Sequence, residues 1–276
     1  MTPDSAPTRP LTRNVRPDRR PVDIEAYEAN GGYAALRASI GQRAPSECLQ
    51  TVIDSGLRGR GGAGFPTGTK WKFVPGREDS GPGHRYLICN ADEMEPGTFK
   101  DRLLMECDPH QLIEGMILAA YTIDADIAYV FIRGEYAYAT RLLREAIAAA
   151  RARGYLGADI LGSGYSLDMH VHVSAGRYIC GEETALINAL EGKRAIPRAK
   201  PPFPQVSGLW GRPTIVNNVE TLCSVPHILA WGADWYRGLG RGEDSGTKLY
   251  GFSGRVNRPG CWELPIGTTA REILEE

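Results

Sequence analysis

The sequence predicts an α/β fold with a largely parallel sheet, and three observations lead to this class. From residue 85 onward, short β-rich runs are separated by longer segments with helical periodicity. Hydrophobic residues make up 42% and charged residues 24% of the 276 residues, which are the proportions of a folded globular chain. The runs and the helical segments alternate along the chain. Alternation of this kind is typical of parallel strands covered by helices.

Each expected element has its own signal. Apolar runs predict buried strands at 85–90, 128–133 and 169–174. Apolar residues at helical spacing predict helices at 108–123, 136–153 and 181–191, the last two of which end at glycines. Ahead of the first strand, Pro45 is placed to begin a helix that buries Val52 and Ile53 and ends near Gly56.

The carboxyl-terminal part contains a long irregular segment and a hairpin. Residues 192–216 include five prolines, which predict a long ordered loop or a flexible linker. Strand-like residues in 247–262 predict a hairpin, followed by a capped helix over 268–276. We therefore divide the chain into a flexible N-terminal arm over 1–22, an α/β domain over 23–245, and the start of a smaller domain over 246–276.

Composition and charge exclude several classes of protein. The formal net charge is −1, so no global field attracts nucleic acid. The longest apolar stretches, 116–121 and 127–132, are far too short to cross a bilayer. The closest pair of cysteines, Cys89 and Cys107, is eighteen positions apart, so no zinc or iron–sulfur spacing is present and a reduced cytosolic chain is expected.

A glycine-dense segment is the first candidate for chemistry. Gly59–Gly64 has the letters of the dinucleotide fingerprint G-x-G-x-x-G, and Asp79 lies at about the offset of a ribose-binding acid. That fingerprint requires a preceding strand, whereas residues 45–56 predict a helix. We therefore expect a loop whose backbone amides approach a flat or anionic ligand, next to the rings of Phe65 and Phe73. The alternative is a surface loop beside core aromatic residues.

Polar clusters follow the expected strands. Asp92, Glu93 and Glu95 follow the first strand, and Glu182 and Glu183 open the helix at 181–191. These acids could accept hydrogen bonds from a sugar or ribityl chain, or they could be a solvated turn and a helix start favoured by the helix dipole.

A second group of polar residues follows in the chain. Asn217 and Asn218, with Thr221 one turn later, open another helix and are candidates either for an anion site or for capping. Lys200 and Phe203, in the proline-rich segment, offer a cation and a ring to a nucleotide.

Six segments together resemble one family, the NADH-oxidising flavoprotein subunits of bacterial respiratory complex I, an NADH:quinone oxidoreductase. Relatives of that family serve as diaphorase subunits of soluble hydrogenases and formate dehydrogenases. The resemblance runs from about residue 21 to the last residue. The segments are Gly59–Lys70, Asn90–Gly97, Asp101–Glu106, Gly176–Thr184, Lys200–Pro204 and Pro213–Thr221.

The resemblance implies non-covalent FMN on which NADH stacks, with hydride transfer to the flavin. By resemblance, the flavin contacts are Arg60, Gly61, Gly62, Lys70, Asn90, Asp92, Glu93, Tyr178, Gly181, Glu182, Glu183, Val216, Asn217, Asn218 and Thr221. The implied NADH contacts are Phe65, Phe73, Glu95, Glu183, Lys200 and Phe203. Glu95 and Glu183 are the positions assigned to catalysis.

The resemblance also implies a larger assembly. Full-length members continue from a β-grasp-like domain, which begins here near residue 246, into a helical bundle that binds a [4Fe–4S] cluster. This chain holds no ligands for that cluster, so we expect it to be a fragment. The implied partners are a [2Fe–2S] subunit and a large iron–sulfur subunit, at the cytoplasmic face of the bacterial inner membrane.

Two alternatives to a complex I subunit stay open at this point. One is a diaphorase subunit of a soluble NAD-dependent hydrogenase or formate dehydrogenase, which differs only in its partners. The other is a non-catalytic nucleotide-binding module that uses the same glycine loop. Flavin absorbance that bleaches with NADH would exclude the non-catalytic nucleotide-binding module.

Overall fold

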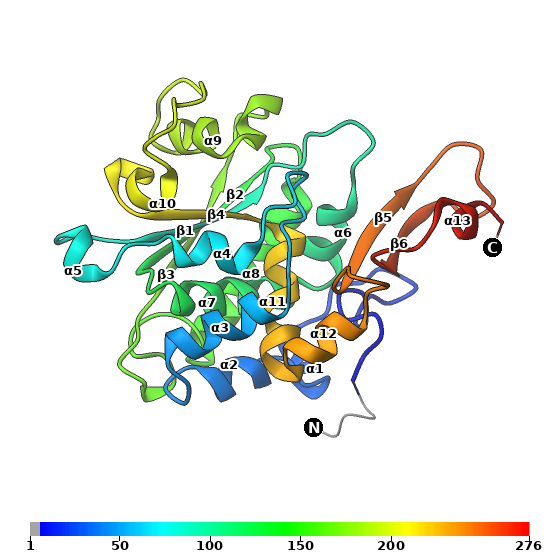
Figure 1. Cartoon of the computed structure of the whole chain (residues 1–276), viewed down its shortest axis with the longest axis horizontal. Coiled ribbons are helices and arrows are strands. Elements are labelled where there is room, and N and C mark those ends of the chain that lie inside the picture. The colour runs from blue at the N-terminus through cyan, green and yellow to red at the C-terminus, as the bar shows by residue number, and fades with distance from the viewer. Residues whose placement is uncertain (1–5, 276) are drawn as a thin grey trace.

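The computed structural model describes residues 6–275 and has a four-stranded parallel sheet at its centre. Its strands are β1 (Tyr86–Ala91), β2 (Ile127–Ile132), β3 (Asp168–Val173) and β4 (Thr214–Asn218), in the spatial order β3-β2-β1-β4. Helices lie on both faces of this sheet (Figure 1). The predicted α/β class is therefore confirmed, as are the three predicted strands.

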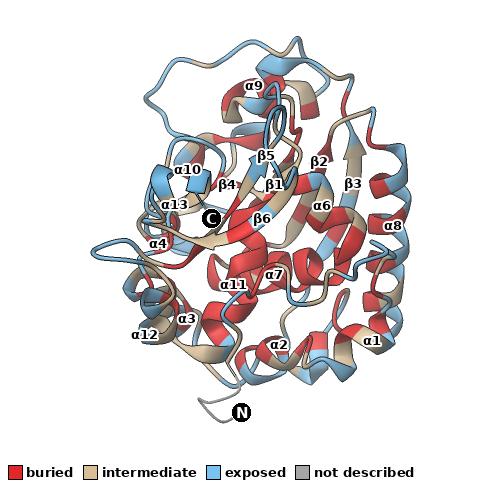
Figure 2. Ribbon diagram, turned by 90° about the vertical axis from the view of Figure 1, so that its right-hand side faces the viewer, coloured by how far each residue is buried: buried red, intermediate tan, exposed pale blue. Residues whose placement is uncertain are grey.

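The larger core lies between one face of the sheet and the helices that cover it. Those helices include α6 (Lys100–Cys107), α7 (Pro109–Thr122), α8 (Ala137–Ala152) and α11 (Val219–Trp231). Figure 2 shows α7 and α11 buried over most of their length, whereas α8 is buried on one side only. The two central helices are in close contact because Gly115 has no side chain: a Cβ there would lie 2.1 Å from the carbonyl oxygen of Leu222.

A smaller core lies on the opposite face of the sheet. There η3 (Tyr178–Gly181), α9 (Glu183–Leu190), α10 (Pro204–Ser207) and η4 (Leu209–Gly211) cover the strands. Leu186 and Ile187 of α9 belong to one apolar cluster with Ile88, Phe131 and Val216 of the strands. This cluster fixes the start of α9 beside the carboxyl ends of β1 and β4.

The N-terminal third is helical. It contains α1 (Ile24–Ala29), α2 (Ala34–Ser39), α3 (Pro45–Asp54), α4 (Thr67–Lys72) and α5 (Arg77–Ser80). The predicted helix from Pro45 is confirmed: proline occupies its first turn, and Glu47 accepts a hydrogen bond of 2.8 Å from the backbone N–H of Ala44. A helix therefore precedes the glycine loop, as the sequence indicated.

Residues 6–22 differ from the flexible arm that we expected. Leu11 is buried, and its backbone N–H and that of Thr12 donate to the carboxylate of Glu263 at 3.1 and 2.8 Å. The side chain of Gln111, on α7, donates to the carbonyl of Leu11. The described part of the arm is thus fastened to the body by a buried carboxylate, which the sequence pattern around Leu11 did not reveal.

The predicted hairpin is confirmed, with β5 (Thr247–Phe252) and β6 (Gly260–Pro265) antiparallel and followed by α13 (Ala270–Glu275). It lies beside the body, after α12 (Ala233–Gly238). Glu220 of α11 accepts a hydrogen bond of 2.8 Å from the N–H of Leu249, which joins the hairpin to the main core. The boundary at residue 246 stays a prediction.

The segment 192–216 is only partly irregular. It contains α10, η4 and the first three residues of β4, a strand that we did not predict. β4 is short and directly follows Pro213, so the sequence pattern was interpreted as the end of the proline-rich loop. Across residues 6–275, none of the helices combines the length and the apolar character needed to span a membrane.

Candidate functional site

The order in which strands are added to the sheet reverses between β1 and β4. The chain passes from β1 to β2 and β3 on one side, and then returns to place β4 on the other side of β1. Asn90 and Asn218, at the carboxyl ends of these two strands, are paired in register. In open α/β sheets, ligands bind at the carboxyl ends of the strands where the strand order reverses.

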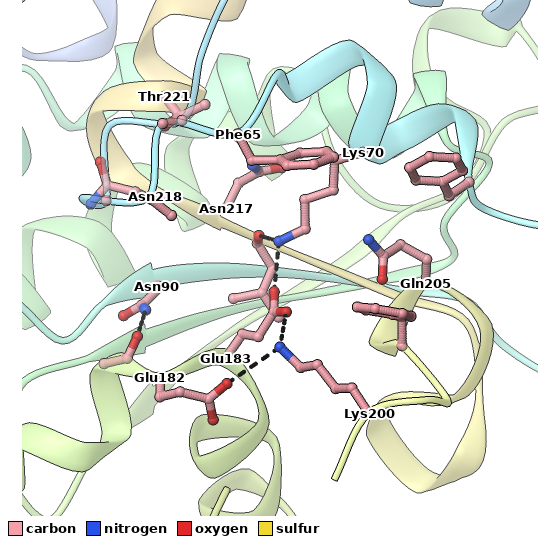
Figure 3. Close-up of a pocket in the computed structure, with 18 of the residues that line it drawn as sticks. Phe65, Lys70, Asn90, Glu182, Glu183, Lys200, Gln205, Asn217, Asn218 and Thr221 are labelled. Atoms are coloured by element: carbon pink, nitrogen blue, oxygen red, sulfur yellow. Dashed lines mark hydrogen bonds and ion pairs between the residues drawn. The ribbon is translucent and has the colours of Figure 1, made fainter. Parts of the chain in front are cut away.

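A cavity of about 880 Å³ opens at this point (Figure 3). Its volume lies within the usual range of small-molecule sites. It is lined by Gly59, Gly61, Ala63, Gly64, Phe65, Lys70, Phe73, Asn90, Gly181, Glu182, Glu183, Lys200, Phe203, Gln205, Val206, Val216, Asn217, Asn218 and Thr221. The structure thus gathers the polar ends of β1 and β4, the glycine loop, the start of α9 and the proline-rich segment around one space.

The glycine loop forms one wall of the cavity. It is closed at its base by a hydrogen bond of 2.9 Å from the N–H of Gly59 to the carbonyl of Phe65. The N–H of Arg60 donates to the hydroxyl of Thr221 at 2.9 Å, which fixes the loop to α11. Gly62 has φ +114°, a conformation that L side chains rarely adopt, and nothing lies within 4 Å of where its Cβ would be. The loop therefore leaves bare backbone beside open space.

An ion-pair relay crosses the cavity from Lys70 to Lys200 through Glu183. Nζ of Lys70 lies 2.6 Å from Oε2 of Glu183, and Nζ of Lys200 lies 2.8 Å from Oε1. Burial by itself would raise the pKa of Glu183, but the two ammonium groups outweigh it and hold that pKa below its usual value. Glu183 is accordingly an anion that offers hydrogen-bond acceptors to a ligand beside two cations.

The backbone N–H groups at the start of α9 are bonded to the side chain of its N-cap residue, Glu182. Glu182 accepts hydrogen bonds of 2.9 Å from the N–H groups of Thr184 and Ala185. The carboxylate takes the place that an anionic ligand would need. Phosphate binding at this helix start is therefore disfavoured.

The asparagines at the strand ends are held by neighbours. Asn90 donates to the carbonyl of Gly181 at 2.9 Å, and Asn217 accepts from the indole N–H of Trp71 at 2.7 Å. Asn218 caps α11, since its side-chain oxygen accepts from the N–H of Glu220 at 3.0 Å. Capping, one of the two roles that the sequence left open, is what Asn218 does. These bonds give the polar end of the cavity a fixed shape.

Three phenylalanines line the cavity without being buried. Phe65 is 49% exposed, Phe73 is 54% exposed and Phe203 is 53% exposed. Exposed rings gathered around a cavity are typical of sites that stack on planar ligands.

Six of the residues predicted for the site do not line the cavity. They are Arg60, Gly62, Asp92, Glu93, Glu95 and Tyr178. The guanidinium of Arg60 is directed to the hydroxyl of Tyr236 and the carbonyl of Thr247, both at 3.2 Å. Gly62 lies in the glycine loop between the lining residues Gly61 and Ala63, with open space where its Cβ would be. The assignments of all six to ligand binding stay predictions.

The remaining four residues outside the lining are the acids Asp92, Glu93 and Glu95, and Tyr178, which is hydrogen-bonded to Glu95. Glu93 is buried and accepts from the N–H groups of Asp101 and Arg102, so it caps the start of α6. Asp92 accepts from the hydroxyl of Ser174, and burial raises its pKa. Glu95 and Tyr178 are exposed and bond to each other at 2.6 Å, which raises the pKa of the Tyr178 hydroxyl.

Five lining residues were absent from the sequence-based assignment: Gly59, Ala63, Gly64, Gln205 and Val206. The three in the glycine loop lie within a motif that had been recognised. Gln205 and Val206 carried no signal, because a glutamine and a valine in a proline-rich segment match no motif. In the part of the chain that the structure describes, no group of three or more His, Cys, Asp or Glu residues is placed to hold a metal ion.

Comparison with known proteins identifies the family. Residues 52–227 match the family described as the Nuo51 FMN-binding domain. The chain belongs to this family. The matched range extends from α3 into α11 and so includes the glycine loop, the sheet and the ion-pair relay.

Individual curated proteins that are similar to this chain support its membership of the FMN-binding family. The F subunits of the NADH-quinone oxidoreductases of Salmonella typhimurium and Escherichia coli are each 57% identical over 269 residues, which is 98% of this chain. The chain spans about 60% of the length of these curated relatives.

Solved structures with the same fold include the NAD+-reducing [NiFe]-hydrogenase. The chain matches its air-oxidized form with a TM-score of 0.79 and 43% identity, covering 93% of this chain and 43% of that one. The H2-reduced form matches with a TM-score of 0.75 and 44% identity, covering 90% of this chain and 41% of that one.

The cavity of this family member fits a flavin mononucleotide. Nothing lies within 4 Å of where Cβ atoms would be at Gly62 and Gly64, so the loop backbone is open to a close ligand. At Gly61, a Cβ would lie only 3.3 Å from the Cβ of Asn218, so a side chain would crowd the cavity between the loop and Asn218. Polar groups at one end and an apolar lining elsewhere match a ligand with a polar chain and a flat ring.

Proposed function

We propose that this chain binds FMN and NADH in one cavity and carries out the NADH-oxidising half-reaction of an NADH:quinone oxidoreductase. The observation that supports it best is the position of the cavity at the carboxyl ends of β1 and β4, where the strand order reverses. The glycine loop, the Lys70–Glu183–Lys200 relay and three exposed phenylalanines meet there. Membership of the FMN-binding family supports the identity of the flavin.

When bound, FMN supplies the acceptor for a hydride from NADH. The chain contributes positioning, because hydride transfer requires two rings held face to face at contact distance. Thr221 fixes the glycine loop through the N–H of Arg60, and Lys70 is held by the carbonyl of Val216 at 2.9 Å as well as by Glu183. These bonds fix the positions of the glycine loop and of Lys70 at the flavin side of the cavity.

The nicotinamide dinucleotide is assigned to the remaining part of the cavity. Phe65, Phe73 and Phe203 offer faces for the adenine ring, and Lys200 offers a cation for the diphosphate. Glu183 contacts both lysines and is placed to accept from a ribose hydroxyl. Glu95, whose carboxylate accepts from the hydroxyl of Tyr178, stays assigned to the nicotinamide end on the family resemblance alone.

The same proposal extends to the assembly. The likeness to the F subunits of NADH-quinone oxidoreductases supports a place beside a [2Fe–2S] subunit and a large iron–sulfur subunit, on the cytoplasmic face of a bacterial inner membrane. Electrons leave this chain for clusters held elsewhere, because its six cysteines have none of the tight spacing that a [4Fe–4S] cluster commonly uses.

A second candidate is a diaphorase subunit of a soluble hydrogenase. The likeness to the NAD+-reducing [NiFe]-hydrogenase, at 43% identity, favours it as a related function. The two candidates share the same half-reaction and differ in partners. The genes that flank this one separate them, because a complex I operon and a hydrogenase operon encode different partners.

The test is NADH-dependent reduction of ferricyanide by the purified chain after incubation with FMN. We expect activity that requires FMN and that is lost when FMN is removed by gel filtration after mild denaturation. A chain that retains FMN and yet leaves NADH unoxidised would contradict the proposal and favour a non-catalytic nucleotide-binding module.

A further inference from the structure

Gln205 has a buried amide oxygen with no hydrogen bond. The residue is 7% exposed, and its Oε1 atom has no hydrogen-bond partner within the described residues 6–275. Buried polar atoms in folded proteins are nearly always paired, because leaving one unpaired costs about 1–3 kcal/mol. An unpaired amide that lines a cavity therefore indicates a ligand that supplies the partner.

The amide lies at the end of the cavity away from the strand-end asparagines. Figure 3 shows Gln205 projecting into the space on the side opposite Asn90 and Asn218, with Lys70 and Lys200 between them. The exposed ring of Phe203 also lines the cavity, two residues before Gln205 in the chain. A ligand part that meets Gln205 is therefore next to an aromatic face and beyond the lysines.

Backbone hydrogen bonds of its neighbours hold the turn that carries Gln205. Phe203 is the N-cap of α10, whose first residue is Pro204, and its carbonyl accepts from the N–H groups of Val206 and Ser207 at 2.9 and 3.0 Å. The following residue, Gly208, donates to the carbonyl of Arg212 at 2.8 Å and so ties the turn to the approach to β4. These bonds fix the backbone from which the Gln205 side chain reaches the cavity lining.

The chemistry of the amide selects the kind of ligand group. A primary amide has a donor and an acceptor in one plane, and glutamine pairs in this way with the edge of adenine, accepting from its 6-amino group while donating to a ring nitrogen. A phosphate group only accepts, so it would leave Oε1 unpaired. A planar base with an amino group satisfies both atoms while its faces meet the phenylalanines.

We propose that Gln205 recognises the hydrogen-bonding edge of the adenine base of the dinucleotide, with Oε1 accepting from the 6-amino group. This inference rests on the proposed function, since it identifies the residue that selects one end of the same substrate. Gln205 touches the base and not the reacting atoms, so it determines affinity and base preference and takes no part in the hydride step.

The test measures binding without turnover. The ligands are ADP-ribose, its analogue in which hydrogen replaces the 6-amino group, and nicotinamide mononucleotide, each titrated calorimetrically into the FMN-loaded chain. For the unmodified chain we expect the analogue to bind about tenfold more weakly than ADP-ribose. Gln205→Leu should bind ADP-ribose about tenfold more weakly and no longer distinguish the two ligands, while its affinity for nicotinamide mononucleotide stays unchanged.

Gln205→Asn keeps the amide but withdraws it by one methylene group, so we expect it to lose the same discrimination. Gln50→Leu, on the exposed side of α3, is the matched control and should bind all three ligands as the unmodified chain does. An equal loss on removing the 6-amino group in the unmodified chain and in Gln205→Leu would overturn the inference alone. No binding of ADP-ribose to the unmodified chain would overturn the proposed function as well.

Discussion

Lys70 and Glu183 are joined by an ion pair of 2.6 Å between Nζ and Oε2, although 113 residues separate them in the sequence. Lys70 belongs to α4 and Glu183 to the first turn of α9, so the pair links elements on opposite sides of the cavity. The second oxygen of Glu183 is held by Lys200 at 2.8 Å. A change at Glu183 therefore acts on both lysines and on the shape of the space between them.

Glu183→Gln should weaken binding of the nicotinamide dinucleotide, both NADH and NAD+, and reduce FMN retention. The amide is neutral and leaves the two ammonium groups without their shared carboxylate, which should cost on the order of 1–3 kcal/mol in binding free energy. The dissociation constant of NAD+ and the flavin content after purification measure the two effects. Glu145→Gln, on the exposed surface of α8, is the control. Unchanged NAD+ affinity and flavin content would remove Glu183 from the site.

Gly62→Val should prevent FMN from binding while the fold is retained, because the side chain enters the space beside the loop. Gly157 has φ +113°, nearly that of Gly62 at +114°, and at neither position does an atom lie within 4 Å of where a Cβ would be. Gly157→Val thus carries the same backbone strain away from the cavity and should bind FMN normally. Fluorescence titration with FMN compares the two variants. Full flavin occupancy in Gly62→Val would mean that the loop is not the cradle.

Thr221→Val should loosen the glycine loop and lower FMN affinity by roughly 1–3 kcal/mol, because the buried N–H of Arg60 loses its acceptor. Thr140 offers a matched substitution, since its hydroxyl is buried and unpaired among residues 6–275. Thr140→Val should leave FMN affinity unchanged. The same titration measures both variants, and equal FMN affinities for the two would show that Thr221 does not support the site.

Asp108→Asn should flatten the dependence of stability on pH. Asp108 is buried at the start of α7, and burial raises its pKa from 3.8 to about 7, against the opposing effect of hydrogen bonds from Asn14 and from the N–H of Gln111. The native state then binds a proton that the unfolded chain releases near pH 4. The stabilisation from this proton is complete below that pH and is lost as pH rises through about 7.

The size of this effect is on the order of 4 kcal/mol between pH 4 and pH 8. Chemical denaturation at several pH values measures it. The exposed Asp79→Asn variant is the control and should keep the pH dependence of the unmodified chain. An equal decline of unfolding free energy with pH in Asp108→Asn would assign the decline to other groups.

The alternation of strands and helices was readable from the sequence because buried strands and helices have different apolar periods. β1, β2 and β3 and the helices α7, α8 and α9 were predicted for this reason. β4 was missed because it is short, follows a proline and ends in two asparagines, which are turn residues in most contexts. Its strand character comes from pairing with β1, and such pairing is not visible in a local pattern.

The site shows the same limit. The glycine loop, Glu183, Lys200 and the phenylalanines carry recognisable motifs, and the structure brings them to one cavity. The carboxylate of Glu93 accepts from N–H groups of α6, a role that its local sequence did not indicate, and its assignment to the flavin stays a prediction. Gln205 had no motif at all. What an acid or an amide does depends on whether its neighbours satisfy it, and that is decided by packing.

The central claim is that one cavity holds FMN and NADH in contact, and the most direct test is the absorption spectrum of the FMN-loaded chain during anaerobic titration with NADH. We predict that the visible flavin bands bleach in proportion to the NADH added until they are gone, and that they return on admission of oxygen. Flavin bands that stay unchanged while NADH accumulates unoxidised would contradict the account.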